Sequence, residues 1–303
     1  HSYITAASQD IEYKNYEDWV KNYLGDKIAD NYMIPYNKKL WCIDISKLNT
    51  AWLSKIPETD LKLILKTIVE KKANFDESVV SHSSFYYPKE GGFQTIIDSI
   101  AKHVKDKILL NTRADTIRYD SDSGLWFVNE EFVAKKIITT IPWPLLDIQG
   151  LPEFDFKSEM DNLEVLSNVI SLWERDPYTH DNHWMYIPDP EVEQHREFYI
   201  KNIAPHSKEG GVMTDINYKR WLENGKKWKA GTPLAEHVNV WSYPLPTTIY
   251  KESIRKILDF TKDYNLYGLG RWGQWQYFNT DQCIKQAIDF FENEKDFDYF
   301  KIF

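Results

Sequence analysis

The spacing of apolar residues changes twice along this chain, from a helical period to a strand period and back to a helical one. A helix is predicted from Tyr16, with Asn15 as its N-cap, and Pro35 is expected to end it. Further helices are predicted at 61–71, 94–104, 254–262 and 281–291, where apolar positions recur every three or four residues. Period-two runs predict strands at 108–110, 116–119, 125–128, 136–141, 163–173, 184–187, 197–203, 212–216 and 238–243. This order predicts an α/β to α+β fold and not a regular βαβαβ array.

The charge balance excludes two classes of partner. The chain has 303 residues, with 37 Lys and Arg against 46 Asp and Glu, and its net charge is −9. Nucleic acids and anionic membranes need a basic surface, so neither is expected to bind. No apolar run of about 18 residues is present, so no membrane span is expected. Cys42 and Cys283 lie far apart without zinc-type spacing, which favours a reducing, cytoplasmic location and no metal site.

Aromatic residues are unusually frequent. The chain contains 12 Trp, 19 Tyr and 15 Phe, together 15% of its residues. Such an excess suggests a planar ligand or a sugar, because aromatic rings stack on both. Trp184 and Tyr186 alternate in a predicted strand and therefore share one face. They are candidates for a stacking platform, although two core aromatics would show the same pattern.

Two glycine-rich segments are candidates for close backbone approach to a ligand. The pattern GxGxxG occurs at 268–273, but the strand-like run 274–277 follows it and the next helix is predicted only near Asp281. This segment therefore does not match the first turn of a dinucleotide-binding fold. A glycine turn that carries Arg271 still suits a phosphate or a flavin ring. Gly91 and Gly92, just before a predicted helix, could serve a flat or anionic ligand or form a plain turn.

Several short segments stand out in chain order: 33–41 (MIPYNKKLW), 84–92 (SFYYPKEGG), 137–142 (IITTIP), 184–189 (WMYIPD), 243–247 (YPLPT) and 270–277 (GRWGQWQY). Together they resemble landmarks of the UDP-galactopyranose mutases and of the wider amine-oxidase-like flavoproteins, and the resemblance runs from about Tyr16 to Phe291. It implies the C-terminal part of a FAD-dependent oxidoreductase-type fold (FAD/NAD-linked reductase-like). Such a fold has a mixed sheet, a helical insertion and an antiparallel substrate-binding sheet.

The resemblance also implies a cofactor, a substrate and site residues. In the mutases, reduced FAD attacks the anomeric carbon of UDP-galactopyranose through N5, and the sugar ring opens and recloses as the furanose; NAD(P)H is a candidate reductant. Arg271 would lie at the FAD phosphates or ribityl chain, Ala114 at the adenine, and Gly91 and Gly92 at the isoalloxazine. The remaining cofactor positions are Gly270 and Gly273. The sugar-nucleotide positions are Asn37, Trp41, Tyr86, Trp184 and Tyr186, with Tyr243 and Tyr277 at the diphosphate.

The chain departs from the mutase pattern in two respects. The family begins with a βαβ unit that bears a glycine fingerprint, which this sequence lacks, so a missing N-terminal segment or a second chain is expected to supply it. The mutases also use arginines where this sequence has Tyr86 and Ile200, and Arg175 or Arg196 could replace them. The expected organisation is a helical substrate-cleft segment (1–80), FAD-binding residues (81–150 and 248–303) and an antiparallel substrate sheet (151–247).

Three functions follow as hypotheses. The first is a FAD-dependent enzyme on a nucleotide sugar, resembling UDP-galactopyranose mutase. The second is a FAD-dependent oxidoreductase of the amine-oxidase-like type on another small molecule, which the lost arginine positions favour. The third is a flavin-free protein that binds a sugar or a nucleotide. The remaining alternative is a globular protein whose aromatic excess merely fills the core.

Overall fold

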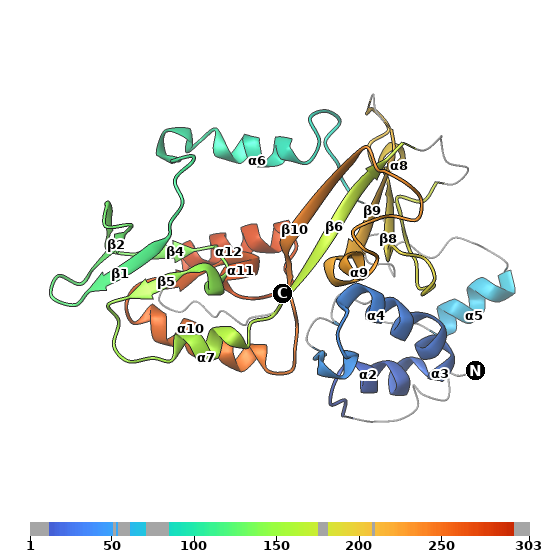
Figure 1. Ribbon diagram of the computed structural model, residues 1–303, viewed down its shortest axis with the longest axis horizontal. Coiled ribbons are helices and arrows are strands. Elements are labelled where there is room, and N and C mark those ends of the chain that lie inside the picture. Colours follow the sequence, from blue (N-terminus) through green and yellow to red (C-terminus); the bar gives the residue numbers. More distant parts are fainter. Residues whose placement is uncertain are drawn as a thin grey trace. The chain divides into compact units, whose positions relative to one another are not determined.

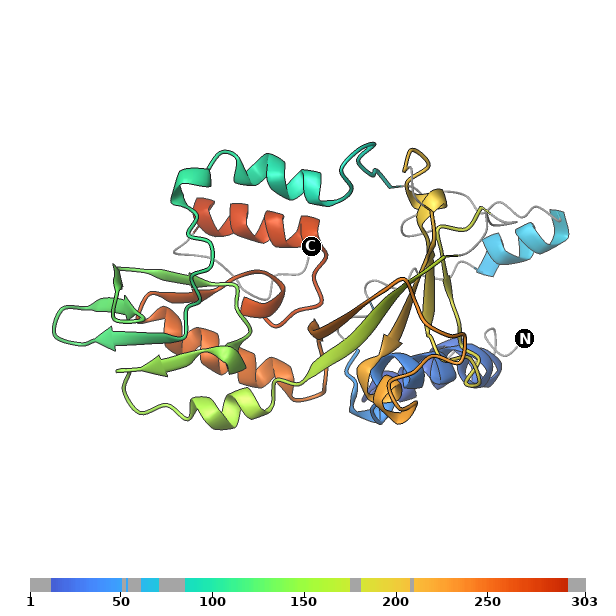
Figure 2. The ribbon, with the colours of Figure 1, turned by 45° about the horizontal axis from the view of Figure 1, so that its top comes forward.

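The computed structural model describes residues 12–50, 53, 61–70, 85–174, 181–207 and 210–293. The chain forms two compact units, each made of two separate stretches (Figures 1 and 2). Unit 1 comprises His1–Ile108 and Ser167–Val240, and unit 2 comprises Leu109–Leu166 and Trp241–Phe303. The chain thus leaves unit 1 after Ile108 and returns to it at Ser167, whereas the sequence led us to expect boundaries at 80, 150 and 247.

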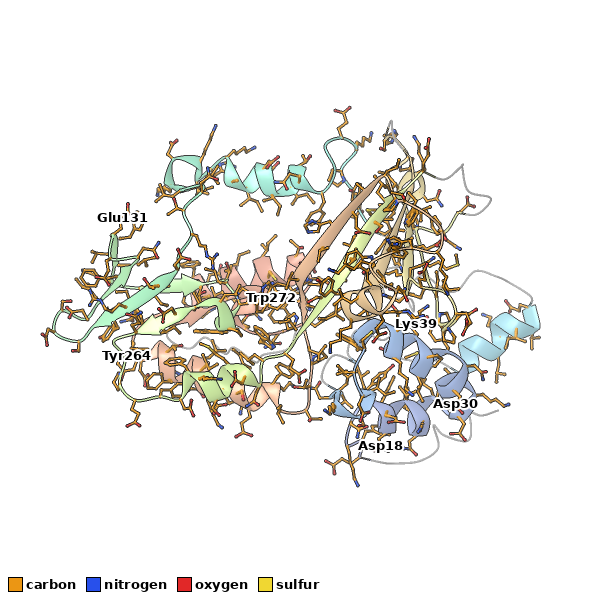
Figure 3. All side chains as sticks on the ribbon, viewed as in Figure 1. Asp18, Asp30, Lys39, Glu131, Tyr264 and Trp272 are labelled. Carbon is orange, nitrogen blue, oxygen red and sulfur yellow. The ribbon has the colours of Figure 1, made fainter. Side chains whose placement is uncertain are left out.

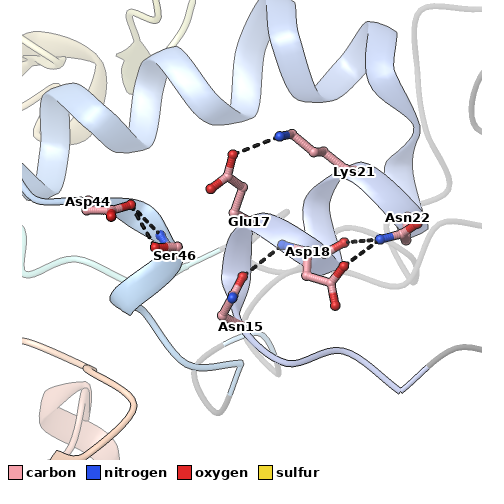
Figure 4. Close-up of polar contacts among 7 residues, drawn as sticks. All are labelled: Asn15, Glu17, Asp18, Lys21, Asn22, Asp44 and Ser46. Carbon is pink, nitrogen blue, oxygen red and sulfur yellow. Dashed lines mark hydrogen bonds and ion pairs between the residues drawn. The ribbon is translucent and has the colours of Figure 1, made fainter.

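Unit 1 begins with a winding run of short helical segments. They are α2 (Tyr16–Trp19), the π-helix η1 (Val20–Leu24), α3 (Asp26–Ile28), the π-helix η2 (Ala29–Met33), α4 (Ile34–Trp41) and the 3₁₀ turn η3 (Ile45–Lys47). Asn15 is the N-cap of α2, as predicted, and its side chain accepts a 2.9 Å hydrogen bond from the Asp18 N–H (Figure 4). The prediction that Pro35 ends the helix is wrong. Pro35 lies in the first turn of α4, where its missing N–H leaves no bond unmade.

Unit 1 also contains a five-stranded sheet, in the order β10-β6-β9-β8-β7. The strands are β6 (Val165–Trp173), β7 (Trp184–Tyr186), β8 (Arg196–Tyr199), β9 (Val212–Asn217) and β10 (Ala235–Pro244). The pairings β6–β9, β9–β8 and β8–β7 are antiparallel. The strand predicted over 197–203 ends at Tyr199, because the chain turns into the short helix α8 (Ile200–Ile203). Helix α9 (Tyr218–Glu223), which was not predicted, follows β9 directly.

Tryptophans account for much of the packing of this sheet. Its core cluster consists of Val169, Trp173, Ile216, Trp221 and Trp228. Part of the aromatic excess is therefore ordinary core, as one interpretation of the composition expected. Unit 1 also contains α5 (Leu61–Glu70), α6 (Gln94–Ala101) and the 3₁₀ turn η5 (Lys105–Lys107). Helix α6 ends three residues before the predicted end at Val104.

Unit 2 is built on two small sheets. One has the order β3-β2-β1-β5, with β1 (Thr116–Asp120) antiparallel to β2 (Leu125–Val128) and parallel to β5 (Asp147–Gln149), so the sheet is mixed. Strand β3 (Phe132–Ala134) completes it. The other sheet pairs β4 (Ile137–Thr139) with β11 (Leu266–Gly268) in parallel. The strand predicted at 108–110 does not form, and all three apolar side chains there are exposed.

Helices and tryptophans surround the sheets of unit 2. The helical segments are η6 (Trp143–Leu145), α7 (Phe156–Asp161), α10 (Tyr250–Lys262), α11 (Gly270–Gly273) and α12 (Thr280–Glu292). The predicted helices at 254–262 and 281–291 correspond to α10 and α12. The core includes the fully buried side chains Trp126, Trp143, Trp275, Ile254, Ile257, Leu258 and Phe290. Within the described residues, none of the helices is both long and apolar enough to cross a membrane.

Candidate functional site

Three tyrosine rings meet at the surface of unit 1. Tyr32 and Tyr36 lie one helical turn apart, and their rings are nearly parallel, with 6.0 Å between the centroids. The ring of Tyr186, from β7, meets Tyr36 edge-on at 5.4 Å. Tyr32 is 38% exposed and Tyr186 42%, so the rings are open to solvent. We call Tyr32, Tyr36 and Tyr186 the tyrosine platform.

The sheet extends the tyrosine platform with further aromatic and charged side chains. Tyr186 pairs with Arg196 across β7 and β8, and Trp184 pairs with Phe198, so these four side chains share one face. The Arg196 guanidinium lies 4.5 Å above the Phe198 ring. The ring of Phe85 lies 5.9 Å from that of Trp184. This face offers flat rings and one cation, which suits a nucleotide or a sugar phosphate.

Arg196 belongs to a largely buried ionic cluster with Asp215 and His195. Asp215 of β9 accepts 2.6 Å and 2.7 Å bonds from Arg196 and Asn168, and its Oδ2 lies 3.6 Å from Nε2 of buried His195. Burial opposes ionisation of Asp215, but His195 and the Arg196 guanidinium outweigh it and lower its pKa. Burial also lowers the pKa of His195, despite the neighbouring carboxylate. Asp215 is therefore held as a carboxylate beside the Arg196 guanidinium.

Asn37 and Trp41, expected to line the sugar-nucleotide cleft, lie inside the helical part of unit 1. Each is 3% exposed. The Trp41 indole donates to the Asn37 Oδ1 at 2.9 Å, and the Asn37 amide donates to the Tyr16 hydroxyl at 2.6 Å and to the Met33 carbonyl at 2.8 Å. Their polar atoms thus bind the helical segments to one another, which favours a structural role in this conformation.

Unit 2 brings three other expected site residues together. The Arg271 guanidinium donates through Nε and Nη2 to the Phe278 carbonyl, at 2.8 Å and 2.5 Å, and lies 4.8 Å above the Tyr243 ring. Tyr243 in turn stacks on Tyr277, with 4.8 Å between centroids and 23° between planes. We call Arg271, Tyr243 and Tyr277 the arginine–tyrosine cluster. Its cation is oriented before any ligand arrives, which suits recognition of phosphate.

The glycine segment at 268–273 differs from the expectation. It lies between a strand and a helix after all, because β11 ends at Gly268 and the four-residue α11 begins at Gly270, while 274–277 is not a strand. Gly268 and Gly273 touch each other: a Cβ on Gly268 would lie 2.2 Å from the Gly273 oxygen. These two glycines allow β11 and α11 to pack. Gly270, with φ of +71°, has more open surroundings.

The other expected cofactor and substrate positions are exposed or lie in turns. Gly91 and Gly92 both have positive φ, +73° and +65°, in the turn before α6. Ala114 is half-buried just before β1, where the Asn129 side chain accepts hydrogen bonds from the backbone N–H groups of 115 and 116. Tyr86 is fully exposed, whereas Ile200 begins α8. Arg175, the other candidate replacement arginine, lies outside the described residues.

The expected residues divide between the units. Unit 1 carries Asn37, Trp41, Tyr86, Gly91, Gly92, Trp184 and Tyr186, and unit 2 carries Ala114, Tyr243, Gly270, Arg271, Gly273 and Tyr277. The sequence interpretation missed Tyr32 and Tyr36, although their i, i+4 spacing on a helix could have indicated the stack. Across the described part of the chain, no group of three or more His, Cys, Asp or Glu side chains could hold a metal ion.

The chain shares its fold with several solved enzymes. In particular, the chain is similar to a UDP-galactopyranose mutase solved in its reduced form, with a TM-score of 0.78 and 19% identity over 97% of this chain and 70% of the mutase. It is also similar to a putrescine oxidase (TM-score 0.52, 10% identity, 87% of this chain) and to a fatty acid isomerase from P. acnes (TM-score 0.56, 10% identity, 96% of this chain). The chain spans 63% of the oxidase and 74% of the isomerase. No model of a protein family matches the sequence.

Proposed function

We propose that this chain belongs to a FAD-dependent enzyme that acts on a nucleotide sugar, as UDP-galactopyranose mutases do. The observation that carries the proposal is the exposed tyrosine platform, whose Tyr186 lies opposite Arg196 on one face of the sheet. A base stacks on such rings, and a diphosphate accepts hydrogen bonds from a guanidinium. In a chain whose fold matches a mutase at a TM-score of 0.78, this combination favours a nucleoside diphosphate sugar over an amine.

Unit 2 supplies the groups proposed to hold FAD. Arg271 uses Nε and Nη2 for the Phe278 carbonyl, and within the described residues no acceptor takes its Nη1. That nitrogen is the candidate donor to an FAD phosphate. Ala114 and Gly270 remain the proposed backbone approaches in this unit. Gly91 and Gly92 belong to unit 1, and their role at the isoalloxazine stays a prediction. Bound FAD would supply the nucleophile for opening and reclosing the sugar ring, while the protein places the substrate and shields it from water.

Arg196 is our candidate for the charge that the mutases obtain from the two arginine positions. Tyr86 offers a neutral hydroxyl at one of these positions and Ile200 offers nothing at the other. Arg196 lies on the same face of the sheet as Tyr186, and its pairing with Asp215 fixes its direction. Tyr243 and Tyr277 of unit 2 are proposed to donate hydroxyl hydrogen bonds to a diphosphate. A nicotinamide reductant and a cytoplasmic location complete the proposal.

We further propose that a βαβ segment, upstream in the protein or on a second chain, completes the FAD-binding part. Ile96, Ile97, Ile100 and Val104 of α6 and the turn after it are between 36% and 51% exposed, an apolar face that normally packs against another element. Parallel strands usually lie inside larger sheets covered by helices. Within the described residues, β4 and β11 form a parallel sheet of two strands only.

The cofactor proposal predicts that Arg271→Ala weakens FAD binding in the full-length protein. Loss of a charge-assisted bond to a phosphate is expected to raise the Kd for FAD about tenfold to a hundredfold. Flavin fluorescence titration measures it, with Arg255→Ala on the exposed face of α10 as the control. Equal affinities of the wild type and Arg271→Ala would contradict the assigned role. A full-length protein that binds no flavin would favour the flavin-free binding protein.

The substrate proposal predicts that Tyr36→Ala weakens the binding of UDP. Loss of one stacked ring costs about 1–3 kcal/mol, so the Kd is expected to rise about fivefold to a hundredfold. Calorimetry measures the Kd, and Tyr36→Phe, which keeps the ring, is expected to bind like the wild type. If Tyr36→Ala binds UDP as tightly as Tyr36→Phe, the tyrosine platform is not the base site.

The alternative is an oxidoreductase on another substrate, favoured by Tyr86 and Ile200 at the two arginine positions. Such an enzyme would pass a hydride from a substrate C–H bond to FAD and return the electrons to oxygen or a quinone. Product analysis separates the two candidates. The mutase proposal expects a furanose product from UDP-galactopyranose with the reduced protein, whereas the alternative expects oxidised product and none of the furanose.

A further inference from the structure

Lys39 is a buried lysine, and within the described residues its ammonium donates only to a distant part of the chain. It lies in α4 (Figure 3) and is 4% exposed, and its ammonium donates to the carbonyls of Ile187, Asp189 and Gln194 at 2.9, 2.7 and 2.7 Å. An ammonium has three N–H donors, so each of them is used. All three acceptors belong to the loop between β7 and β8, which we call the β7–β8 loop (187–194).

Arg220 of α9 binds the same loop. Its Nε donates to the Glu193 carbonyl at 3.1 Å, and its Nη2 donates to the carbonyls of Val192 (3.3 Å) and Pro190. Six carbonyls of the β7–β8 loop thus accept bonds from two cations. Buried carbonyls that lose their donors cost free energy, so the conformation of the loop depends on these cations.

The β7–β8 loop starts immediately after Tyr186 and ends immediately before His195. Lys39 lies three residues after Tyr36 on the same helix, so α4 both carries the central ring of the tyrosine platform and holds the loop that continues from Tyr186. We infer that Lys39 is a positioning residue of the nucleotide site, which anchors the β7–β8 loop to α4 and thereby sets the contact between Tyr36 and Tyr186. The inference rests on the proposed function for its ligand.

The charges around Lys39 make its anchoring sensitive to alkaline pH. Arg220, Asp189 and His195 face it from α9, the loop and the residue just before β8. Burial, with a further contribution from Arg220, lowers the pKa of Lys39 to about 8. At neutral pH the ammonium makes three bonds. Above pH 8 the neutral amine has two N–H groups, so one loop carbonyl loses its donor.

The experiment compares Lys39→Met with Lys38→Met, which removes the adjacent exposed lysine of α4. At pH 7, Lys39→Met is expected to speed amide hydrogen exchange in 187–194, to remove the ring-to-ring NOE between Tyr36 and Tyr186, and to raise the Kd for UDP about tenfold. Lys38→Met is expected to match the wild type in all three. Lys39→Met with wild-type values, or with faster exchange but an unchanged NOE, would overturn the inference.

The wild type alone provides a second test, which holds even if Lys39→Met fails to fold. Between pH 7 and 9.5, the Tyr36–Tyr186 NOE and the affinity for UDP are expected to fall together, with a midpoint near the Lys39 pKa of about 8. The phosphates of UDP are already ionised in that range, since such groups titrate at about pH 6. An NOE that stays constant to pH 9.5 overturns the inference. A falling NOE without any UDP binding supports it and contradicts the proposed nucleotide ligand instead.

Discussion

Asp215→Asn is expected to lower the free energy of unfolding at pH 7 by about 3–5 kcal/mol, because it leaves a partly buried cation without its counter-charge. Asp215 is 1% exposed, and its carboxylate accepts a 2.6 Å bond from Arg196 and a 2.7 Å bond from Asn168. An amide of the same shape carries no charge to balance the guanidinium. Urea unfolding measures the loss, and Asp181→Asn, at an exposed position of unit 1, is the control.

The ion pair between Asp215 and Arg196 also predicts how this loss of unfolding free energy depends on pH. The pKa of Asp215 is lower in the folded protein than in the unfolded chain, where it is about 4. Its stabilisation is therefore complete above that unfolded value and declines as the pH falls through it toward the folded pKa. The difference between the wild type and Asp215→Asn is expected to shrink from pH 6 to pH 3. A difference that stays constant over this range would show that Asp215 is not held ionised by its neighbours.

His195 makes a second contribution to the pH dependence of stability, at a higher pH than Asp215 does. Its pKa in the folded protein lies below the unfolded value of about 6.5, so the unfolded chain binds the proton more tightly. Stability is therefore expected to fall as the pH drops below about 6.5, in the wild type and in Asp215→Asn alike. His195→Gln removes this component and leaves the one at lower pH, which separates the two groups.

Periodicity was sufficient to predict the elements that carry long amphipathic patterns. Helices α10 and α12 were expected from the spacing of Ile254, Ile257 and their neighbours, and β6 from a run rich in Val, Ile and Trp. The strand predicted at 108–110 failed because three apolar residues say nothing about a partner strand. The strand predicted at 197–203 was wrong in its second half. Residues Ile200–Ile203 include strand-forming isoleucines, yet they form the short helix α8.

The candidate site was predictable only as a set of residue types. The share of aromatic residues pointed to stacking, and Tyr243, Tyr277 and Arg271 do meet in unit 2. Asn37 and Trp41 belong to an equally conspicuous segment, yet they bond to each other and to Tyr16. Sequence spacing gives the face of a helix but not what covers it. The bonds from Lys39 to 187–194 span about 150 residues, beyond the range of any local pattern.

Replacing Gly268 or Gly273 by Ala is expected to destabilise unit 2 by about 3 kcal/mol or more, because the new methyl group would meet rigid backbone. A Cβ on Gly268 would lie 2.2 Å from the Gly273 oxygen, and one on Gly273 would lie 2.5 Å from the Thr139 oxygen. Neither atom can retreat easily. The Gly273 carbonyl accepts a 2.8 Å bond from the Trp143 indole, and the Thr139 carbonyl accepts a 2.9 Å bond from Leu269.

Two other glycines provide graded controls. Gly270→Ala would place its Cβ no closer than 3.9 Å to the Cys283 Sγ, so the only cost is the positive φ of +71°, about 1–2 kcal/mol. Gly210→Ala meets only the flexible side chain of Lys201, at 3.4 Å, and is expected to change stability by less than about 0.5 kcal/mol. Urea unfolding without added cofactor measures the unfolding free energies of the glycine variants and so ranks them. If Gly273→Ala is as stable as Gly210→Ala and only FAD binding suffers, then Gly273 serves the cofactor, as the family resemblance suggests, and not the packing of α11 on β11.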